Sequence, residues 1–235
     1  MYSTTADDKK RIQKIRMMSY FIEATHKIIE EEGFEYITIR KVSDLAGYNS
    51  ATIYNYFENL DHLICFASMK YLKEYSQNLS VYTKGAKNSI EKFLNIWKAF
   101  CIYSFKKPKV FYTLFFDKFS QSLKNMVQEY YEIFPDDLGE HYDGTLPMLL
   151  KQNLNDRNKA ILLSCVEDGY IREDDVDELN EMIILIYRGM LERILKDTDS
   201  YSPEEATEKV IAYISRSLKA YQVEHSIDDT LKLIS

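Results

Sequence analysis

Hydroxyl-bearing and aromatic side chains recur at short intervals between residues 38 and 57, and their types are suited to binding rather than to catalysis. A short helix over the second half of this run would carry on its outward side Ser50, Ala51, Thr52, Tyr54 and Tyr56. Small residues allow a close approach to the edges of bases, and phenol hydroxyls can donate hydrogen bonds to phosphate oxygens. The run therefore predicts a surface that contacts a nucleic-acid duplex.

A first short helix is expected to position this surface. Thr38 can cap it by accepting a backbone N–H bond. Its buried stripe, with spacings of three and four, would consist of Ile39, Val42 and Ala46. The residues expected in solvent lie off that stripe and are Arg40, Lys41, Ser43 and Asp44.

A glycine turn would join this helix to the second one. Gly47 follows the last apolar residue, at the C-cap of the helix. The backbone there is usually left-handed, and glycine adopts that conformation with less strain than any other residue. Asn49 is placed to cap the second helix, and Ile53 and Phe57 supply its buried side. This layout is typical of a helix-turn-helix, which sets its second helix into the DNA major groove. An ordinary helical hairpin with packed tyrosines is the alternative.

A more specific pattern runs through both helices. It consists of Thr38, Val42, Leu45, Ala46, Gly47, Thr52, Ile53, Tyr54, Tyr56, Phe57 and Leu63. The pattern resembles the DNA-binding signature of TetR-family transcriptional regulators, over about residues 10–65. The resemblance implies an all-α homodimer with an N-terminal three-helix DNA-binding domain and a larger C-terminal domain that binds a small molecule and dimerises.

The resemblance also implies roles for single residues. Thr38, Tyr54 and Tyr56 match positions that contact phosphates, and Ser50, Ala51 and Thr52 match positions nearest the bases. The chain departs from the family pattern at Leu60, where the family usually has a phosphate-binding lysine. One charge-assisted contact is therefore in doubt, although Asn59 can still cap the helix that begins there.

Charge is distributed unevenly along the chain. The net charge of -7 and pI near 5.3 are unusual for a DNA-binding protein, whose footprint is usually basic. Basic residues nevertheless cluster at the start, and we expect this arm to lie along phosphates; a merely solvated arm is the alternative. The complete set expected at DNA is Lys9, Lys10, Arg11, Thr38, Arg40, Asn49, Ser50, Ala51, Thr52, Tyr54, Asn55 and Tyr56.

The fold predicted from composition and periodicity is all-α, because only 7 Gly and 4 Pro stand among 235 residues. Residues 1–60 are expected to form the helix-turn-helix domain, and residues 61–235 a helical ligand-binding and dimerisation domain. Helices are expected at about 8–32, 60–82, 89–105, from 108, 119–134, 148–169, 174–196 and 203–224. The break at 134–147 is either a lid or a disordered connection.

Two features of the larger domain predict partners. The last two helices have broad apolar faces, which indicates a homodimer, with intrachain packing as the alternative. Aromatic residues are dense between 93 and 134, where a cavity would suit an apolar or aromatic effector and a filled core is the alternative. The candidate pocket residues are Trp97, Phe100, Cys101, Phe111, Phe115, Phe116, Phe119, Tyr131 and Tyr187.

Several classes of protein lack support in the sequence. There is no phosphate-binding loop, nucleophile elbow or metal-binding motif, so we expect neither enzymatic activity nor a cofactor or metal. The three cysteines are far apart and are expected to be reduced and buried. No signal peptide or apolar run of about 20 residues is present, so we expect no membrane partner and a cytoplasmic location.

The combined expectation is a ligand-responsive transcriptional regulator. It would act as a repressor, bind a pseudo-palindromic DNA operator as a dimer and be released by a small molecule. The alternatives are an activator, a regulator without small-molecule input, and a helical metabolite-binding protein or enzyme.

Overall fold

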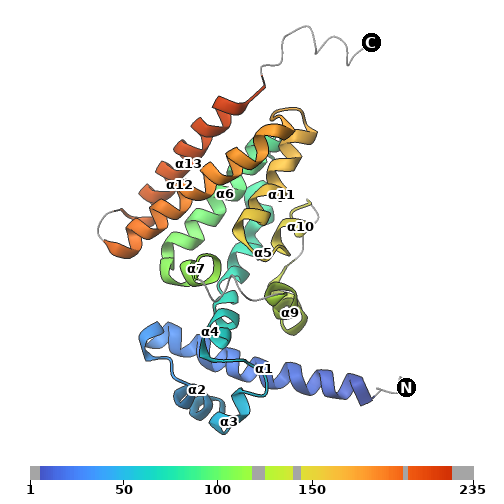
Figure 1. The fold of residues 1–235 in the computed structure, drawn as a ribbon, viewed down its shortest axis with the longest axis vertical. Helices are drawn as coiled ribbons and strands as arrows, with labels where there is room; N and C mark the ends of the chain where they lie inside the picture. Colours follow the sequence, from blue (N-terminus) through green and yellow to red (C-terminus); the bar gives the residue numbers. More distant parts are fainter. Residues whose placement is uncertain (1–5, 118–124, 140–143, 198–200, 224–235) are drawn as a thin grey trace. The chain divides into compact units, whose positions relative to one another are not determined.

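The computed structural model describes residues 6–117, 125–139, 144–197 and 201–223 (Figure 1). Over these residues the regular elements are helices, with an isolated antiparallel bridge between Ile171 and Gln222. The prediction of an all-α fold is thus confirmed. The chain divides into two compact units, one of residues 1–77 and 109–140 and the other of residues 78–108 and 141–235.

The first unit is built around a long N-terminal helix, α1 (Ala6–Glu31). A short 3-10 turn, η1 (Phe34–Tyr36), leads to α2 (Ile39–Ala46) and α3 (Ser50–Ile53), and α4 (Leu60–Met69) follows. Both α2 and α4 pack on α1 (Figure 1). This core buries Phe21 and Ile22 of α1 against Val42, Ile53 and Phe57, each at most 1% exposed.

The single helix predicted over residues 60–82 is wrong. The structure has α4 and a separate α5 (Leu72–Thr83), with a break at Lys70 and Tyr71. Partners distant in sequence hold the side chains at the break: Lys70 Nζ lies 2.6 Å from Glu23, and the Tyr71 hydroxyl donates to Glu30 at 2.5 Å. A periodic pattern cannot reveal such contacts, because both glutamates belong to α1.

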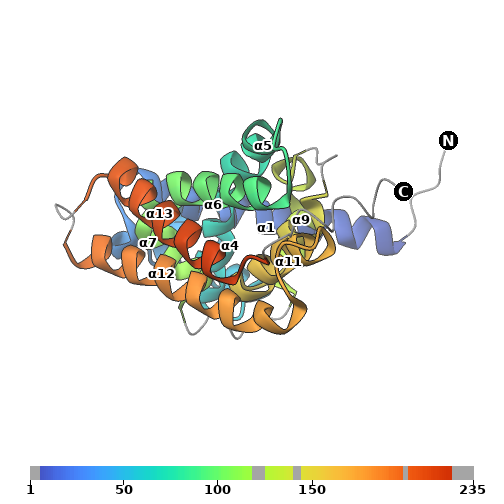
Figure 2. The ribbon, with the colours of Figure 1, turned by 90° about the horizontal axis from the view of Figure 1, so that it is seen from above.

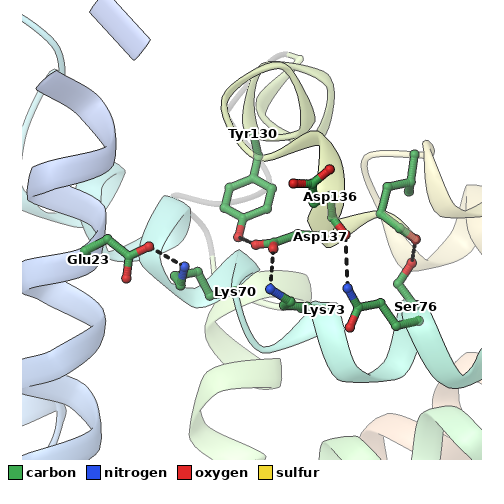
Figure 3. A network of polar contacts seen from close by, with 9 residues as sticks. Glu23, Lys70, Lys73, Ser76, Tyr130, Asp136 and Asp137 are labelled. Carbon is green, nitrogen blue, oxygen red and sulfur yellow. Dashed lines mark hydrogen bonds and ion pairs between the residues drawn. The ribbon is translucent and has the colours of Figure 1, made fainter. Parts of the chain in front are cut away.

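A polar cluster fixes the segment of α9 (Met126–Ile133) and η2 (Pro135–Asp137) within the first unit (Figure 3). Asp137, 4% exposed, accepts a hydrogen bond from the Tyr130 hydroxyl at 2.7 Å and pairs with Lys73 Nζ at 2.9 Å. Gln77 donates to the Asp136 carbonyl at 3.0 Å, and Ser76 donates to the carbonyl of Leu138. The segment is thereby tied to α5, while α9 itself packs on α1 and α4.

The structure describes parts of the helices and of the break predicted between residues 108 and 147. The helix predicted over residues 119–134 is described as α9, and Phe119 lies outside the described residues. The helix predicted from Pro108 is α7 (Pro108–Phe115). Part of the break predicted at 134–147 is η2, and residues 140–143 of it also lie outside the described part of the chain.

The second unit consists mainly of α6 (Ser89–Lys106), α10 (Leu146–Leu149), α11 (Leu154–Glu167), α12 (Val176–Lys196) and α13 (Pro203–Tyr221). A short 3-10 turn, η3 (Glu173–Asp175), precedes α12. Both views show α12 and α13 side by side (Figure 1, Figure 2), and α13 also packs against α6. A buried polar chain links three helices, because Trp97 donates to Asn158 and Asn158 donates to Asn180, each at 2.8 Å.

Two predicted boundaries in this unit are corrected by side chains that bind backbone. Asn88, rather than Ser89, caps α6 and accepts from the Glu91 N–H at 2.8 Å. The helix predicted over residues 148–169 is two helices, α10 and α11. Buried Arg157 of α11 donates to the carbonyls of Leu149 and Lys151, both at 2.9 Å, which holds the chain in a turn between them.

Candidate nucleic-acid interface

The turn between α2 and α3 has the predicted local chemistry. Thr38 accepts a hydrogen bond from the Lys41 N–H at 3.1 Å, and Asn49 accepts one from the Ala51 N–H at 2.9 Å. Gly47 adopts the left-handed backbone, with φ 76°. Its N–H bonds the carbonyl of Asp44, and the Tyr48 N–H bonds that of Ser43. These bonds satisfy the end of α2 and set the direction in which α3 leaves.

The recognition segment 49–56 is partly helix and partly turn. Regular α-helix covers Ser50–Ile53, and the N–H groups of Asn55 and Tyr56 then bond carbonyls three residues earlier. Ile53 is fully buried, whereas Tyr54 is 57% exposed. Ala51 and Asn55 are also exposed, and Thr52 is half-buried. An outward row of small and polar side chains with one exposed phenol is therefore present.

Tyr56 is placed differently from Tyr54. It is half-buried, and its ring centroid lies 6.2 Å from that of Phe21 on α1. Its ring thus packs on the core of the first unit. A phosphate contact by Tyr56 stays a prediction.

Two serines bridge the turn. Ser43 was expected in solvent, but it is buried, and its hydroxyl donates to the carbonyl of Arg40 at 2.8 Å. The expectation is wrong because Ser43 has a polar partner across the turn: the hydroxyl of Ser50 lies 2.8 Å from its own. Ser50 is half-buried at the start of α3, so its hydroxyl links the two helices.

Exposed tyrosines outside the recognition segment were missed by the sequence analysis. Tyr20 on α1 and Tyr48 in the turn are both exposed, with ring centroids 5.9 Å apart. Tyr48 also packs edge-on against Phe21 at 5.6 Å. The available signal was the position of Tyr20 away from the buried stripe of α1.

Cations of the set expected at DNA lie on two helices of the first unit. Lys9, Lys10 and Arg11 are exposed on the first turns of α1. Arg40 is exposed on α2 with its Nε 3.9 Å from Asp44, a contact that contributes little between solvated groups. Lys41, by contrast, pairs with Glu32 and lies over the ring of Tyr36.

The start of α4 is closed by side chains. Asn59 caps it by accepting the His62 N–H at 2.9 Å, as predicted, and His62 Nδ1 accepts the Glu58 N–H at 3.1 Å. Burial, as the largest cause, holds the pKa of His62 below its usual range. Leu60 is half-buried and offers no charge in place of a lysine.

The predicted pocket residues fall in both units. Trp97, Phe100 and Tyr187 are buried in the second unit with ring centroids 5.2 to 5.7 Å apart, and Cys101 is buried there too. Phe111, Phe115, Phe116 and Tyr131 are buried in the first unit. Phe119 lies outside the described residues. That these side chains line one pocket stays a prediction.

A small cavity in the second unit is lined by residues other than the predicted pocket residues. Its volume is about 170 Å³, and it lies among residues of α6, α10 and α11 and the segment before α10. Its apolar lining includes Phe93, Ile96, Met148 and Ile161, and Ser89, Lys92, Thr145 and Ser164 add polar groups.

Other chemistry is sparse in the described part of the chain. The three cysteines are buried and not in disulfides, as predicted, and burial raises the pKa of Cys65 to about 12 and that of Cys165 to about 11. These thiols stay protonated at neutral pH. Among the described residues, no group of three His, Cys, Asp or Glu side chains could hold a metal ion. None of the described helices has the length and apolarity that crossing a bilayer requires.

Comparison with known proteins finds one family model that matches the part of the chain that carries this surface. Residues 21–64 match the family model of bacterial regulatory proteins of the tetR family. No curated protein matches the chain in sequence. Many solved structures share its fold.

Three of these structures illustrate the likeness. A FadR repressor of Thermus thermophilus, in complex with lauroyl-CoA, has a TM-score of 0.59 and 13% identity, over 89% of this chain and 97% of the other. A TetR transcription regulator of Haloarcula marismortui has a TM-score of 0.55 and 16% identity, over 88% of this chain and 98% of the other. FadR of Bacillus subtilis, in complex with stearoyl-CoA, has a TM-score of 0.53 and 17% identity, over 83% of this chain and 96% of the other.

Proposed function

We propose that the chain is a TetR-family transcriptional repressor that binds a pseudo-palindromic operator as a homodimer and is released by a small molecule. One observation carries the DNA-binding part. The caps at Thr38 and Asn49 and the left-handed Gly47 turn Ile53 inward, so that Ala51, Asn55 and Tyr54 face outward. This is the geometry in which a short helix presents side chains to a major groove.

Contacts to DNA are divided by chemistry in this proposal. Tyr54 and Thr38 donate to phosphates, and the exposed Lys9, Lys10, Arg11 and Arg40 supply sequence-independent attraction. Ser50, Ala51 and Thr52 lie nearest the base edges, with Asn49 and Asn55 beside them, and Tyr56 contacts a phosphate. The negative net charge does not oppose this arrangement, because screening limits exposed charges to about 8 Å at physiological salt.

The dimer is proposed to form through α12 and α13. Leu185 on α12 is 60% exposed and Tyr213 on α13 is 42% exposed, although both helices bury apolar residues within the second unit. A second copy would cover these two side chains. Leu185→Glu should shift the full-length protein toward monomer in analytical ultracentrifugation, whereas Val81→Glu, at an exposed position on α5, should not. An unchanged dimer in Leu185→Glu would contradict this interface.

The effector is proposed to be apolar or aromatic. The cavity of about 170 Å³ is close to the ~150 Å³ that accommodates a benzene-sized molecule. The lauroyl-CoA and stearoyl-CoA bound by the two FadR structures are larger and would need the walls to separate. Thermal unfolding with lauroyl-CoA, stearoyl-CoA and benzoate tests both sizes, since a ligand of the native state raises the melting temperature.

A regulator without small-molecule input is the second candidate. It is favoured by the packing of Trp97, Phe100 and Tyr187, three of the residues expected to line a pocket, because their buried rings lie against one another. It predicts that none of the three ligands raises the melting temperature or releases DNA.

The test of the proposed function is a selection of genomic fragments. Full-length protein is incubated with sheared DNA of its own genome, and retained fragments are sequenced and checked by gel retardation. A shared site with twofold symmetry is expected. Retention independent of sequence, or none at physiological salt, would contradict the proposal.

A further inference from the structure

The hydroxyls of Ser43 and Ser50 meet across the turn between α2 and α3, with their oxygens 2.8 Å apart. Ser43 is 1% exposed, whereas Ser50 is half-buried. Solvent can therefore reach the pair of hydroxyls only from Ser50. Ser50 is also the first residue of α3, directly after the Asn49 cap.

A count of protons fixes the direction of this hydrogen bond. A serine hydroxyl has one proton to donate and two lone pairs that accept. The Ser43 oxygen lies 2.8 Å from the carbonyl oxygen of Arg40, which can only accept. Ser43 thus gives its proton to Arg40, and Ser50 gives its own to Ser43. The oxygen of Ser50 keeps lone pairs on its reachable side and has no proton left to donate.

We propose that Ser43 makes Ser50 an obligate hydrogen-bond acceptor at the DNA, so that Ser50 selects a base with an amino group. In the major groove, adenine and cytosine present amino groups that donate, while O6 and N7 of guanine and O4 of thymine accept. On the strand that Ser50 faces, adenine or cytosine satisfies the oxygen. Guanine or thymine places two acceptors against each other. This inference rests on the proposed function.

Ser43 has the role of a positioning residue in this scheme. It does not touch DNA, but its bond to Arg40 determines what Ser50 can offer. Removing the Ser43 hydroxyl frees the Ser50 proton, and the Ser50 hydroxyl can then either donate or accept. The expected consequence is a broader base preference at one position of each half-site.

The experiment is a selection from a randomised duplex library by full-length wild type, Ser43→Ala and Ser50→Ala. Ser19→Ala is the matched control, because the Ser19 hydroxyl also donates to a carbonyl three residues earlier at 2.8 Å, but on α1. Wild type should prefer adenine or cytosine at one position of each half-site by roughly 5- to 150-fold. Ser50→Ala should lose that preference, Ser43→Ala should also admit guanine or thymine there, and Ser19→Ala should match wild type.

Each contrary result has a distinct meaning. A wild-type preference for guanine or thymine at the position that Ser50→Ala alters would overturn the inference. An unchanged base preference in Ser50→Ala would also overturn it. If the base preference changed in Ser50→Ala but stayed unchanged in Ser43→Ala, the role of Ser43 would be refuted. If Ser43→Ala fails to fold, the wild type and Ser50→Ala still decide which base Ser50 selects. No enrichment by wild type would reject the proposed function itself, and this inference with it.

Discussion

Replacing Gly47 with alanine tests whether the turn between α2 and α3 governs DNA binding. Gly47 has φ 76°, a backbone that alanine adopts at a cost of roughly 1–2 kcal/mol. A Cβ added at Gly47 meets no atom within 4 Å, so the cost is conformational and involves no steric clash. Gly47→Ala should therefore lower the free energy of unfolding by about 1–2 kcal/mol, which is about 2–8 °C in melting temperature for a chain of this size.

The matched control is Gly85→Ala. Gly85 has φ 84° and also meets nothing within 4 Å, but it lies in the loop before α6, in the second unit. Both variants should lose similar stability. If the Gly47 variant relieves its backbone strain by moving α3, binding to DNA must restore the strained backbone in both protomers. That costs at most about 4 kcal/mol, or roughly a thousandfold loss of affinity.

Fluorescence anisotropy with a selected DNA fragment measures this loss. Gly47→Ala should bind more weakly and Gly85→Ala should bind like wild type. Gly47→Asn should fall between wild type and Gly47→Ala, because asparagine tolerates the left-handed region better. The reasoning fails if Gly47→Ala is as stable as wild type, or if both alanine variants lose the same DNA affinity.

Three further perturbations test other parts of the structure. Tyr54→Phe should weaken binding to every DNA sequence by a similar factor, since the lost phenol contacts phosphate; altered base preference in a competition assay would refute that role. Lys73→Met should lower the unfolding free energy in urea by about 1–3 kcal/mol, and by more than Asp137→Asn, because it leaves a buried carboxylate without its cation while Lys73 can reach water. The reverse order would contradict the buried charge. The pKa of His62 is lower in the folded state than in the unfolded state, so the unfolded state takes up a proton at a higher pH than the folded state does. The contribution of His62 to stability is therefore complete above about pH 6.5 and falls as the pH drops below that value. His62→Gln should flatten that acid-side decline in thermal unfolding, and an equally steep decline would remove His62 as its source.

Local chemistry made much of the interface predictable from sequence. Thr38, Asn49 and Asn59 cap their helices through bonds to residues two or three positions away, and Gly47 takes the one backbone region that favours glycine. Such bonds depend on residue type and spacing alone. The inward side of α3 followed from Ile53 and Phe57 for the same reason.

Contacts between residues distant in sequence set the limits of that analysis. The break between α4 and α5 depends on glutamates of α1, and the turn between α10 and α11 depends on the guanidinium of Arg157 binding backbone carbonyls. The burial of Ser43 likewise depends on a hydroxyl on the next helix. The helical pattern of each segment was correct in type, but it contained no information on these partners.

Hydroxyl-radical footprinting of the full-length protein on a selected fragment tests the central claim most directly. Two protected half-sites related by twofold symmetry are expected, with centres about 34–36 Å apart along the duplex or a multiple of that distance. Tyr54→Phe should weaken both protections together. A single unsymmetrical footprint, or protection that is unaffected by changes at residues 50, 52 and 54, would contradict the account.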